Sequence, residues 1–482
     1  MASITNRAQP ALDFIPPNYS GWLRRLMQPL MPAVTAYKTD VAELETHNVE
    51  TLVQQYRDFE LGKTRILLAF RHPNPTDPYV LSHLLWRALP QTARKLGTPM
   101  GTTHAHFIYD RGIPLWAGSY LRWVFSRLGG VPIQRGKLDL MALKTARGLL
   151  LDGQFPLAAA PEGGNNGHNE IISPLEPGIA QLAFWCAEDI AAAGRPESVV
   201  ILPVGIQYQY LNAPWAKLEK LMTQLEADSG IGRSSQAEMT NLRQMLMSSA
   251  ALADSPAGNQ AELYVRLYRL AEHLLTLMEG YYREFYGVDL DLSGEAIANG
   301  AAQLDDRSAE PNALLAERLH RLMNEALQVA ECYFQVRPKG SFIDRCRKLE
   351  QAGWDRIFRS DTTSLSPVEL GLANRVAEEA DLRMWHMRLV ERFVAVTGCY
   401  VKESPSVDRF AETTLLLRDM VAKIKGEVVS QALLGKQKAI VTVGEPIEVS
   451  SRLDGYKQKR RSAIADLTKD LSTELESLII TG

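Results

Sequence analysis

The chain has 482 residues, more than one hydrophobic core usually supports, so its length predicts at least two structural units. Hydrophobic residues make up 46% of the chain and charged residues 23%, which is typical of a globular protein and argues against a disordered chain. A net charge of −3 gives no electrostatic reason to expect a nucleic-acid partner, and the four scattered cysteines predict neither a disulfide framework nor a zinc site.

Residues 1–60 are expected to form an N-terminal helical segment. The N-terminus lacks the apolar core of a secretory signal, and the sequence offers no run of ~18 apolar residues that would span a membrane. Apolar residues recur at helical spacing over Trp22–Met31, beside Arg24 and Arg25. This pattern fits either a helix lying in a lipid headgroup layer or a helix packed on the core. The choice between these two stays open, and the scattered cysteines fit a cytoplasmic protein in a reducing environment.

Residues 61–213 show alternating strand and helix patterns. The apolar run Arg65–Phe70 predicts a buried strand, and the following Asp77-Pro78 predicts a helix start with Asp as the cap. Further extended segments are predicted at His106–Tyr109, Gly129–Arg135, Pro156–Ala160 and Val199–Tyr208. This β-α-β order predicts a mainly parallel sheet flanked by helices.

Residues 214–437 are almost wholly helical in pattern, with amphipathic faces that must pack against something. Strand character returns at Lys438–Ile447, and residues 438–482 are expected to supply the closing strand and a final helix. The expected fold class is therefore α/β, with a large all-helical insert before the last strand.

His72 and Asp77 lie five positions apart where the first predicted strand gives way to a helix. An aspartate bonded to one imidazole nitrogen fixes the tautomer, leaves the other nitrogen free to accept a proton and stabilises the imidazolium. Chance alone produces about 0.4 such pairs in a chain of this composition, so the spacing by itself does not identify a site. The downstream motifs decide its meaning.

Three further segments follow the His-Asp pair in order. They are Gly130-Val131-Pro132-Ile133-Gln134-Arg135, Ala160-Pro161-Glu162-Gly163-Gly164 and Ile201-Leu202-Pro203-Val204-Gly205-Ile206. Together the four segments resemble the glycerophospholipid acyltransferase family, which includes the lysophosphatidate acyltransferases. Its members carry His-x4-Asp, Gly-x-Ile-x-x-Arg, Phe-Pro-Glu-Gly and a Val-Pro strand in this order. The resemblance covers roughly residues 60–210 and 438–450 and leaves the helical insert unexplained.

The resemblance implies a role for each motif in acyl transfer from a thioester to an alcohol. His72 would be the general base and Asp77 its orienting partner. Arg135 would bind the phosphate of the acceptor, because a guanidinium can make a two-pronged contact with phosphate oxygens. Glu162 and Gly163 would form a loop that positions the acceptor, with the carboxylate hydrogen-bonded to its hydroxyls and the glycine allowing the backbone to approach it closely. The plainer alternatives are a buried histidine bonded to a helix cap, a surface salt bridge and a simple turn.

The implied donor is acyl-ACP or acyl-CoA, and the implied acceptor is the lysophospholipid 1-acyl-sn-glycerol-3-phosphate, which would become phosphatidate. Neither a metal nor a redox cofactor is implied. Because the acceptor would be a lipid, the resemblance also implies peripheral membrane contact, for which Trp22–Met31 is the expected segment. The helical insert could cap the acyl channel, form an oligomer interface or dock an acyl-carrier protein. The chain departs from the family pattern where Gly164 and Asn165 replace the usual Thr-Arg, where Ala160 replaces Phe, and where Arg71 replaces the Asn that often precedes the histidine. These departures leave the reaction type intact and bear on the acceptor. Lys137 is a further candidate cation.

Three rival functions stay open at this stage. The first keeps the chemistry but acylates glycerol-3-phosphate or another lysolipid. The second is a metal-dependent hydrolase built on His104, His106 and Asp110, whose two histidines share one face of a predicted strand. The third is a non-catalytic helical scaffold that carries a degenerate enzyme domain.

Overall fold

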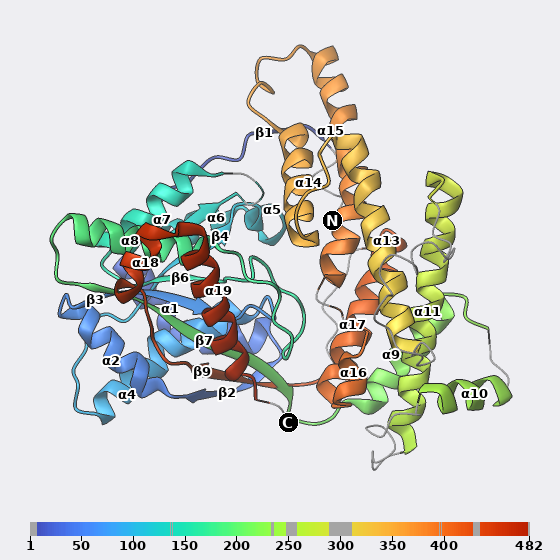
Figure 1. The fold of residues 1–482 in the computed structure, drawn as a ribbon, viewed down its shortest axis with the longest axis horizontal. Coiled ribbons are helices and arrows are strands. Elements are labelled where there is room, and N and C mark those ends of the chain that lie inside the picture. The colour runs from blue at the N-terminus through green and yellow to red at the C-terminus, as the bar shows by residue number, and fades with distance from the viewer. Residues whose placement is uncertain are drawn as a thin grey trace. The chain divides into compact units, whose positions relative to one another are not determined.

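The computed structural model describes residues 7–134, 136, 138–232, 236–246, 258–288, 311–394, 396, 398–427 and 434–480. The chain divides into two compact units. The α/β unit comprises Leu12–Asn212 and Gly435–Gly482, and the helical unit comprises Met1–Ala11 and Ala213–Leu434 (Figure 1).

Among the described residues, eight strands of the α/β unit form one sheet, in the order β2-β9-β7-β3-β6-β4-β5 with β10 beside β7. Their bounds are β2 (Val41–His47), β3 (Thr64–Phe70), β4 (His106–Asp110), β5 (Gly130–Ile133), β6 (Leu157–Ala159), β7 (Ser198–Tyr210), β9 (Gln437–Val443) and β10 (Ile447–Glu448). Strand β3 is parallel to both β6 and β7, and β4 is parallel to β5 and β6. Strands β9 and β10 run antiparallel to β7. The predicted mainly parallel α/β fold is confirmed.

Helices cover both faces of this sheet (Figure 1). One face packs on α1 (Gly21–Lys38), α2 (Val49–Glu60), α3 (Asp77–His83) and α4 (Leu89–Lys95), and the other on α7 (Leu140–Asp152), α8 (Gly178–Ala192), α18 (Leu453–Gln458) and α19 (Arg460–Ser477). Every residue of β3 is buried, with Ile66 and Leu68 facing the first set of helices and Leu67 and Ala69 the second. A strand enclosed on both faces reads as a continuous apolar run, which is why the sequence identifies β3 so clearly.

The N-terminal region is not purely helical, which corrects the expectation for residues 1–60. Strand β2 lies at the end of the sheet and pairs in parallel with β9. Only Val41 of this strand is buried, and its neighbours include Glu43 and Glu45. A polar edge strand lacks the apolar alternation by which strands are recognised in a sequence. Further upstream, β1 (Gln9–Pro10) pairs with β8 (Phe358–Arg359) inside the helical unit.

The helical unit contains α9 (Trp215–Asp228), α10 (Gln236–Leu246), α11 (Gly258–Tyr286), α13 (Pro311–Phe334), α14 (Phe342–Ile357), α15 (Pro367–Phe393), α16 (Tyr400–Glu403) and α17 (Val407–Ile424). Helices α14 and α15 each begin with a capping box, built on Ser341 and Ser366. The residues of this motif can be recognised in the sequence and indicate where each helix starts. None of the helices in the described part of the chain is both long and apolar enough to cross a bilayer.

Candidate active site

The site begins at the carboxyl end of β3, the edge of a parallel sheet where ligands usually bind. The strand ends at Phe70, and α3 starts at Asp77 with Pro78 in its first turn. The short connection turns His72 back toward the helix, so its Nδ1 lies 2.7 Å from Asp77 Oδ2. The structure therefore brings together the two residues that the sequence singles out first.

Asp77 is completely buried and is held by several donors. Its Oδ2 accepts hydrogen bonds from the His72 ring and from the Asn74 backbone N–H at 3.1 Å, and its Oδ1 accepts one from the Tyr208 hydroxyl. Because a carboxylate can only accept, Nδ1 of His72 must carry the proton. The His72 side chain is 24% exposed, and within the described residues its Nε2 has no hydrogen-bond partner. That nitrogen is free to take a proton from a substrate.

Tyr208, which the sequence analysis did not single out, completes this arrangement from β7. Burial raises the pKa of Tyr208 well above its ordinary value, and the negative charge of Asp77 raises it further. The hydroxyl therefore stays protonated and donates to the carboxylate. A tyrosine inside an apolar strand is usually a core residue, so the sequence carries no local signal for this contact.

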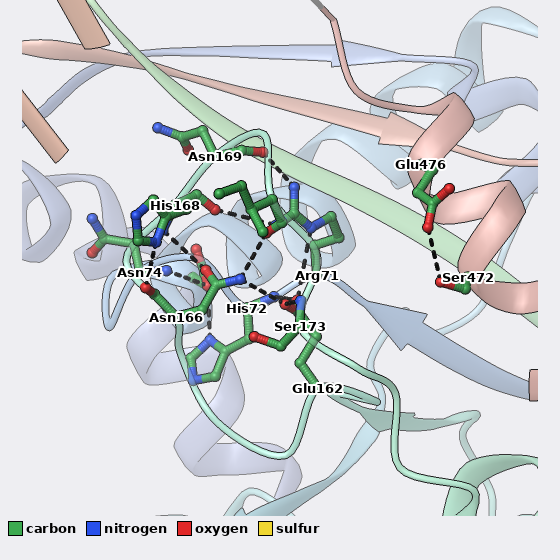
Figure 2. Close-up of polar contacts among 12 residues, drawn as sticks. Arg71, His72, Asn74, Glu162, Asn166, His168, Asn169, Ser173, Ser472 and Glu476 are labelled. Atoms are coloured by element: carbon green, nitrogen blue, oxygen red, sulfur yellow. Dashed lines mark hydrogen bonds and ion pairs between the residues drawn. The ribbon is translucent and has the colours of Figure 1, made fainter. Parts of the chain in front are cut away.

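Glu162 lies in the loop after β6, and its carboxylate points toward Arg71 and Ser173 (Figure 2). Its residue is 2% exposed. One carboxylate oxygen accepts from the backbone N–H of His72 at 3.0 Å, and the other accepts from Asn166 Nδ2 at 3.1 Å and from the Ser173 backbone N–H at 3.0 Å. The sequence analysis expects this carboxylate to bind acceptor hydroxyls, whereas here its acceptor positions are taken by protein donors.

Arg71 neutralises the charge of Glu162 and donates hydrogen bonds to backbone carbonyls of the same loop (Figure 2). Its guanidinium is fully buried, with Nε 3.7 Å from Glu162 Oε1. The other nitrogens donate to the carbonyl oxygens of Asn169, of His168 at 3.2 Å and of Ile171 at 2.7 Å. Arg71 thus fixes the position of the loop that contains residues 162–173.

Gly163 is required by the shape of this turn. Its φ is +69°, a conformation that glycine adopts at little cost and other residues rarely adopt. A Cβ at this position would lie 2.1 Å from Glu176 Oε1. The sequence predicts a glycine that permits close approach, and the group that approaches is the Glu176 side chain.

The rest of the loop is fixed by asparagine side chains. Asn166 bonds Glu162 and also donates to the Ile171 carbonyl at 2.7 Å. Asn169 pairs with both backbone groups of Tyr208, accepting from its N–H at 2.8 Å and donating to its carbonyl at 2.9 Å. The loop is thereby tied to β7 on one side and to His72 on the other.

The predicted phosphate ligand Arg135 and the candidate cation Lys137 lie outside the described residues. Strand β5 confirms the predicted extended segment over Gly130–Ile133. After it, the Gln134 backbone N–H donates to Asp139 Oδ2 at 3.0 Å.

The residues of the hydrolase alternative are engaged by the protein. His104 Nε2 donates to the Leu128 carbonyl at 2.8 Å, and its Nδ1 accepts from Trp86 Nε1 at 3.1 Å. Burial lowers the pKa of His104 to about 3, which keeps it neutral. Asp110 Oδ1 accepts from the backbone N–H two residues on. Among the described residues, no cluster of three or more His, Cys, Asp or Glu side chains could hold a metal ion.

Comparison with known proteins gives one finding. The family model described as Acyltransferase matches residues 43–207, which span the sheet from β2 into β7 and include His72, Asp77, Glu162 and Gly163. Searches of curated proteins and of solved structures returned no match. The matched range ends one residue before Tyr208 and before the helical unit.

Proposed function

We propose that the protein is an acyltransferase whose acceptor is 1-acyl-sn-glycerol-3-phosphate, since the Acyltransferase family model matches residues 43–207 and this range holds the His72–Asp77 pair. The donor is a fatty acyl thioester, acyl-ACP or acyl-CoA, and the product is phosphatidate. The observation that carries the proposal is the His72–Asp77 hydrogen bond at the carboxyl end of β3, with the second ring nitrogen unoccupied among the described residues.

The reaction uses His72 twice. Its Nε2 removes the proton of the acceptor hydroxyl as that oxygen attacks the thioester carbonyl, and Asp77 stabilises the imidazolium that forms. When the tetrahedral intermediate collapses, the new C–O bond is kept and the C–S bond breaks. The imidazolium then gives its proton to the leaving sulfur, so the enzyme returns to its starting state without a covalent acyl-enzyme.

Arg135 is proposed to bind the phosphate of the acceptor, as its place in the family motif implies. We assign Glu162 a positioning role in place of direct acceptor binding. Its Oε1 accepts a hydrogen bond from the His72 backbone N–H at 3.0 Å, which supports this role because the contact fixes the backbone that carries the imidazole. Gly163 then shapes the turn, in which its backbone N–H donates to the Ala160 carbonyl at 3.2 Å.

Peripheral contact with the cytoplasmic face of a membrane is part of the proposal, since the acceptor is a lipid. Helix α1 supports it by packing one side on the core and exposing the other. Leu23 and Arg24 are buried, and Arg24 Nη2 donates to the Thr103 carbonyl at 2.9 Å. Trp22 and Leu26 are 55% and 54% exposed. An exposed apolar stripe on a helix fits an interfacial role.

The decisive experiment compares acyl transfer by the wild type with that of folded His72→Ala and Asp77→Asn variants. We expect kcat to fall by about 10²–10⁴-fold in each, the range that a positioned acid–base group contributes. His47→Ala is the matched control, because His47 lies on β2 with a side chain 41% exposed. Rates near that of the wild type in both site variants would refute the mechanism.

The acceptor is tested separately with purified protein and one acyl donor. Rates on 1-acylglycerol-3-phosphate, glycerol-3-phosphate and a lysolipid without a phosphomonoester are compared. We expect the first to react fastest. A preference for glycerol-3-phosphate would reassign the acceptor and leave the roles of His72 and Asp77 intact.

A further inference from the structure

Tyr208 is bound at both of its ends by parts of the site. Its hydroxyl donates to Asp77 Oδ1, and its backbone N–H and carbonyl pair with the side chain of Asn169. The residue is only 2% exposed. Each polar group of this buried residue is thus satisfied by a side chain of the site, and the hydroxyl is satisfied by the same carboxylate that binds the His72 ring.

The topology of the sheet explains how a residue of β7 reaches Asp77. Strands β3 and β7 pair residue for residue as far as Phe70 and Val204, and the Arg71 N–H then donates to the Val204 carbonyl at 2.9 Å. At this point the first chain turns away into α3, while β7 continues to Tyr210. Tyr208 lies four residues beyond Val204, so period-two alternation keeps both side chains on the face that packs against α3.

Asp77 thus divides its two oxygens between two kinds of donor. Oδ1 receives the phenol, while Oδ2 receives the His72 ring and the Asn74 backbone. A hydrogen bond to a carboxylate stabilises its charged form, and this effect is strong when the carboxylate is fully buried, as Asp77 is. The Tyr208 hydroxyl therefore fixes the plane of the Asp77 carboxylate. It also weakens the attraction between that carboxylate and the proton on His72 Nδ1.

We propose that Tyr208 is a positioning residue of the catalytic pair, which sets how readily His72 takes and releases a proton. This inference rests on the proposed function for its catalytic meaning, although the hydrogen-bond network itself does not. Because Asn169 holds the backbone of Tyr208 and also accepts from Arg71, the same tyrosine links the base to the loop that contains Glu162.

The test is a titration of His72 in the whole protein by NMR of ring-labelled histidine, with the His72 signal assigned by its loss in His72→Ala. In Tyr208→Phe the carboxylate loses one donor and concentrates its charge on the imidazole. We expect the pKa of His72 to rise by about half a unit to one unit relative to the wild type, which is a roughly three- to tenfold gain in its proton affinity. The acidic limb of the kcat profile should move to higher pH by the same amount.

Other charged and titratable groups around the pair stay in place in this variant. Within the described residues they are Glu162, which accepts from the His72 backbone, Arg71, which lies beside Glu162, and His168, whose carbonyl accepts from Arg71. The matched control is Tyr56→Phe, because Tyr56 is equally buried in the same core cluster and its hydroxyl donates to the carbonyl of His104. It should leave the His72 titration unmoved.

An unchanged or lowered pKa of His72 in a Tyr208→Phe variant that stays folded would overturn the inference. So would an equal rise in the Tyr56→Phe control, because the shift would then reflect general loosening of the core. Failure of the proposed function looks different. In that case no acyl transfer is seen with any acceptor, yet the titration of His72 still responds to Tyr208.

Discussion

Replacing Glu162 with glutamine tests whether this residue holds the site together or binds substrate. In the structure the two carboxylate oxygens face N–H donors on every side, from His72, Asn166 and Ser173, and lie close to the Arg71 guanidinium. A glutamine fits the same space. Whichever way its amide turns, however, its NH₂ group points at N–H donors and cannot accept from them.

The expected cost follows from burial. Glu162 and Arg71 both have side chains with no exposed surface, so the substitution leaves a buried guanidinium without its counter-charge. Breaking a buried ion pair by removing one partner costs about 3–5 kcal/mol. The lost hydrogen bonds lie within that figure and are not added to it. Against a total stability of about 5–15 kcal/mol, the Glu162→Gln protein should still fold in the cold but unfold at a much lower temperature.

Urea unfolding followed by circular dichroism measures this difference, with Glu476→Gln as the control. Glu476 accepts from Ser472 at 3.1 Å on the exposed side of α19, so its neutralisation should change the unfolding free energy by less than about 0.5 kcal/mol (Figure 2). If Glu162→Gln is as stable as Glu476→Gln while KM for the acceptor rises, the carboxylate binds substrate and the positioning role is wrong.

Three further outcomes are expected. Gly163→Ala should lower the unfolding free energy in urea by at least about 1 kcal/mol, because φ at this position is positive and a Cβ has no room; a neutral result would mean that the turn rearranges freely. The pKa of His104 is lowered by burial to about 3, so the unfolded chain takes up a proton below its ordinary 6.5 and the folded chain does not. The stability that neutral His104 contributes is therefore complete above pH 6.5, and it falls by about 1.4 kcal/mol by pH 5.5. The unfolding free energy of His104→Gln should decline correspondingly less between these two pH values. An identical slope in both proteins would contradict this. Trp22→Ser combined with Leu26→Ser should weaken sedimentation with phosphatidylglycerol vesicles by at least about tenfold, since each side chain contributes roughly 1.5–3 kcal/mol when buried in an apolar layer. Leu61→Ser, at an equally exposed position on the end of α2, should leave vesicle binding unchanged; equal losses in both would show that the α1 stripe is not the contact surface.

Much of the fold can be predicted because its elements have simple patterns. Strands β3 and β7 are apolar on both faces, and helices α3, α14 and α15 begin at recognisable caps or prolines. Strand β2 could not be found in this way, since it is a polar edge strand whose partner β9 lies almost 400 positions later in the chain. Pairing between strands that lie far apart in the chain produces no signal in a short stretch of sequence.

The site shows a similar division. His72 and Asp77 are recoverable because both stand on one strand-to-helix connection, within a few residues of each other. Tyr208 and Asn169 are not, because their contacts depend on how far β7 extends past β3 and on the path of a loop without regular structure. Glu162 is found by its motif, but the direction of its carboxylate depends on the donors around it.

The pairing of Tyr210 with Gln437 has a consequence for the architecture as a whole. The chain leaves the sheet for the helical unit and returns to it at two neighbouring points, on adjacent antiparallel strands. A two-residue turn of the kind that closes ordinary β-hairpins would satisfy the same geometry. A variant in which such a turn replaces Ala213–Leu434 is therefore expected to keep the register of β3 and β7, while β1 would lose its partner β8.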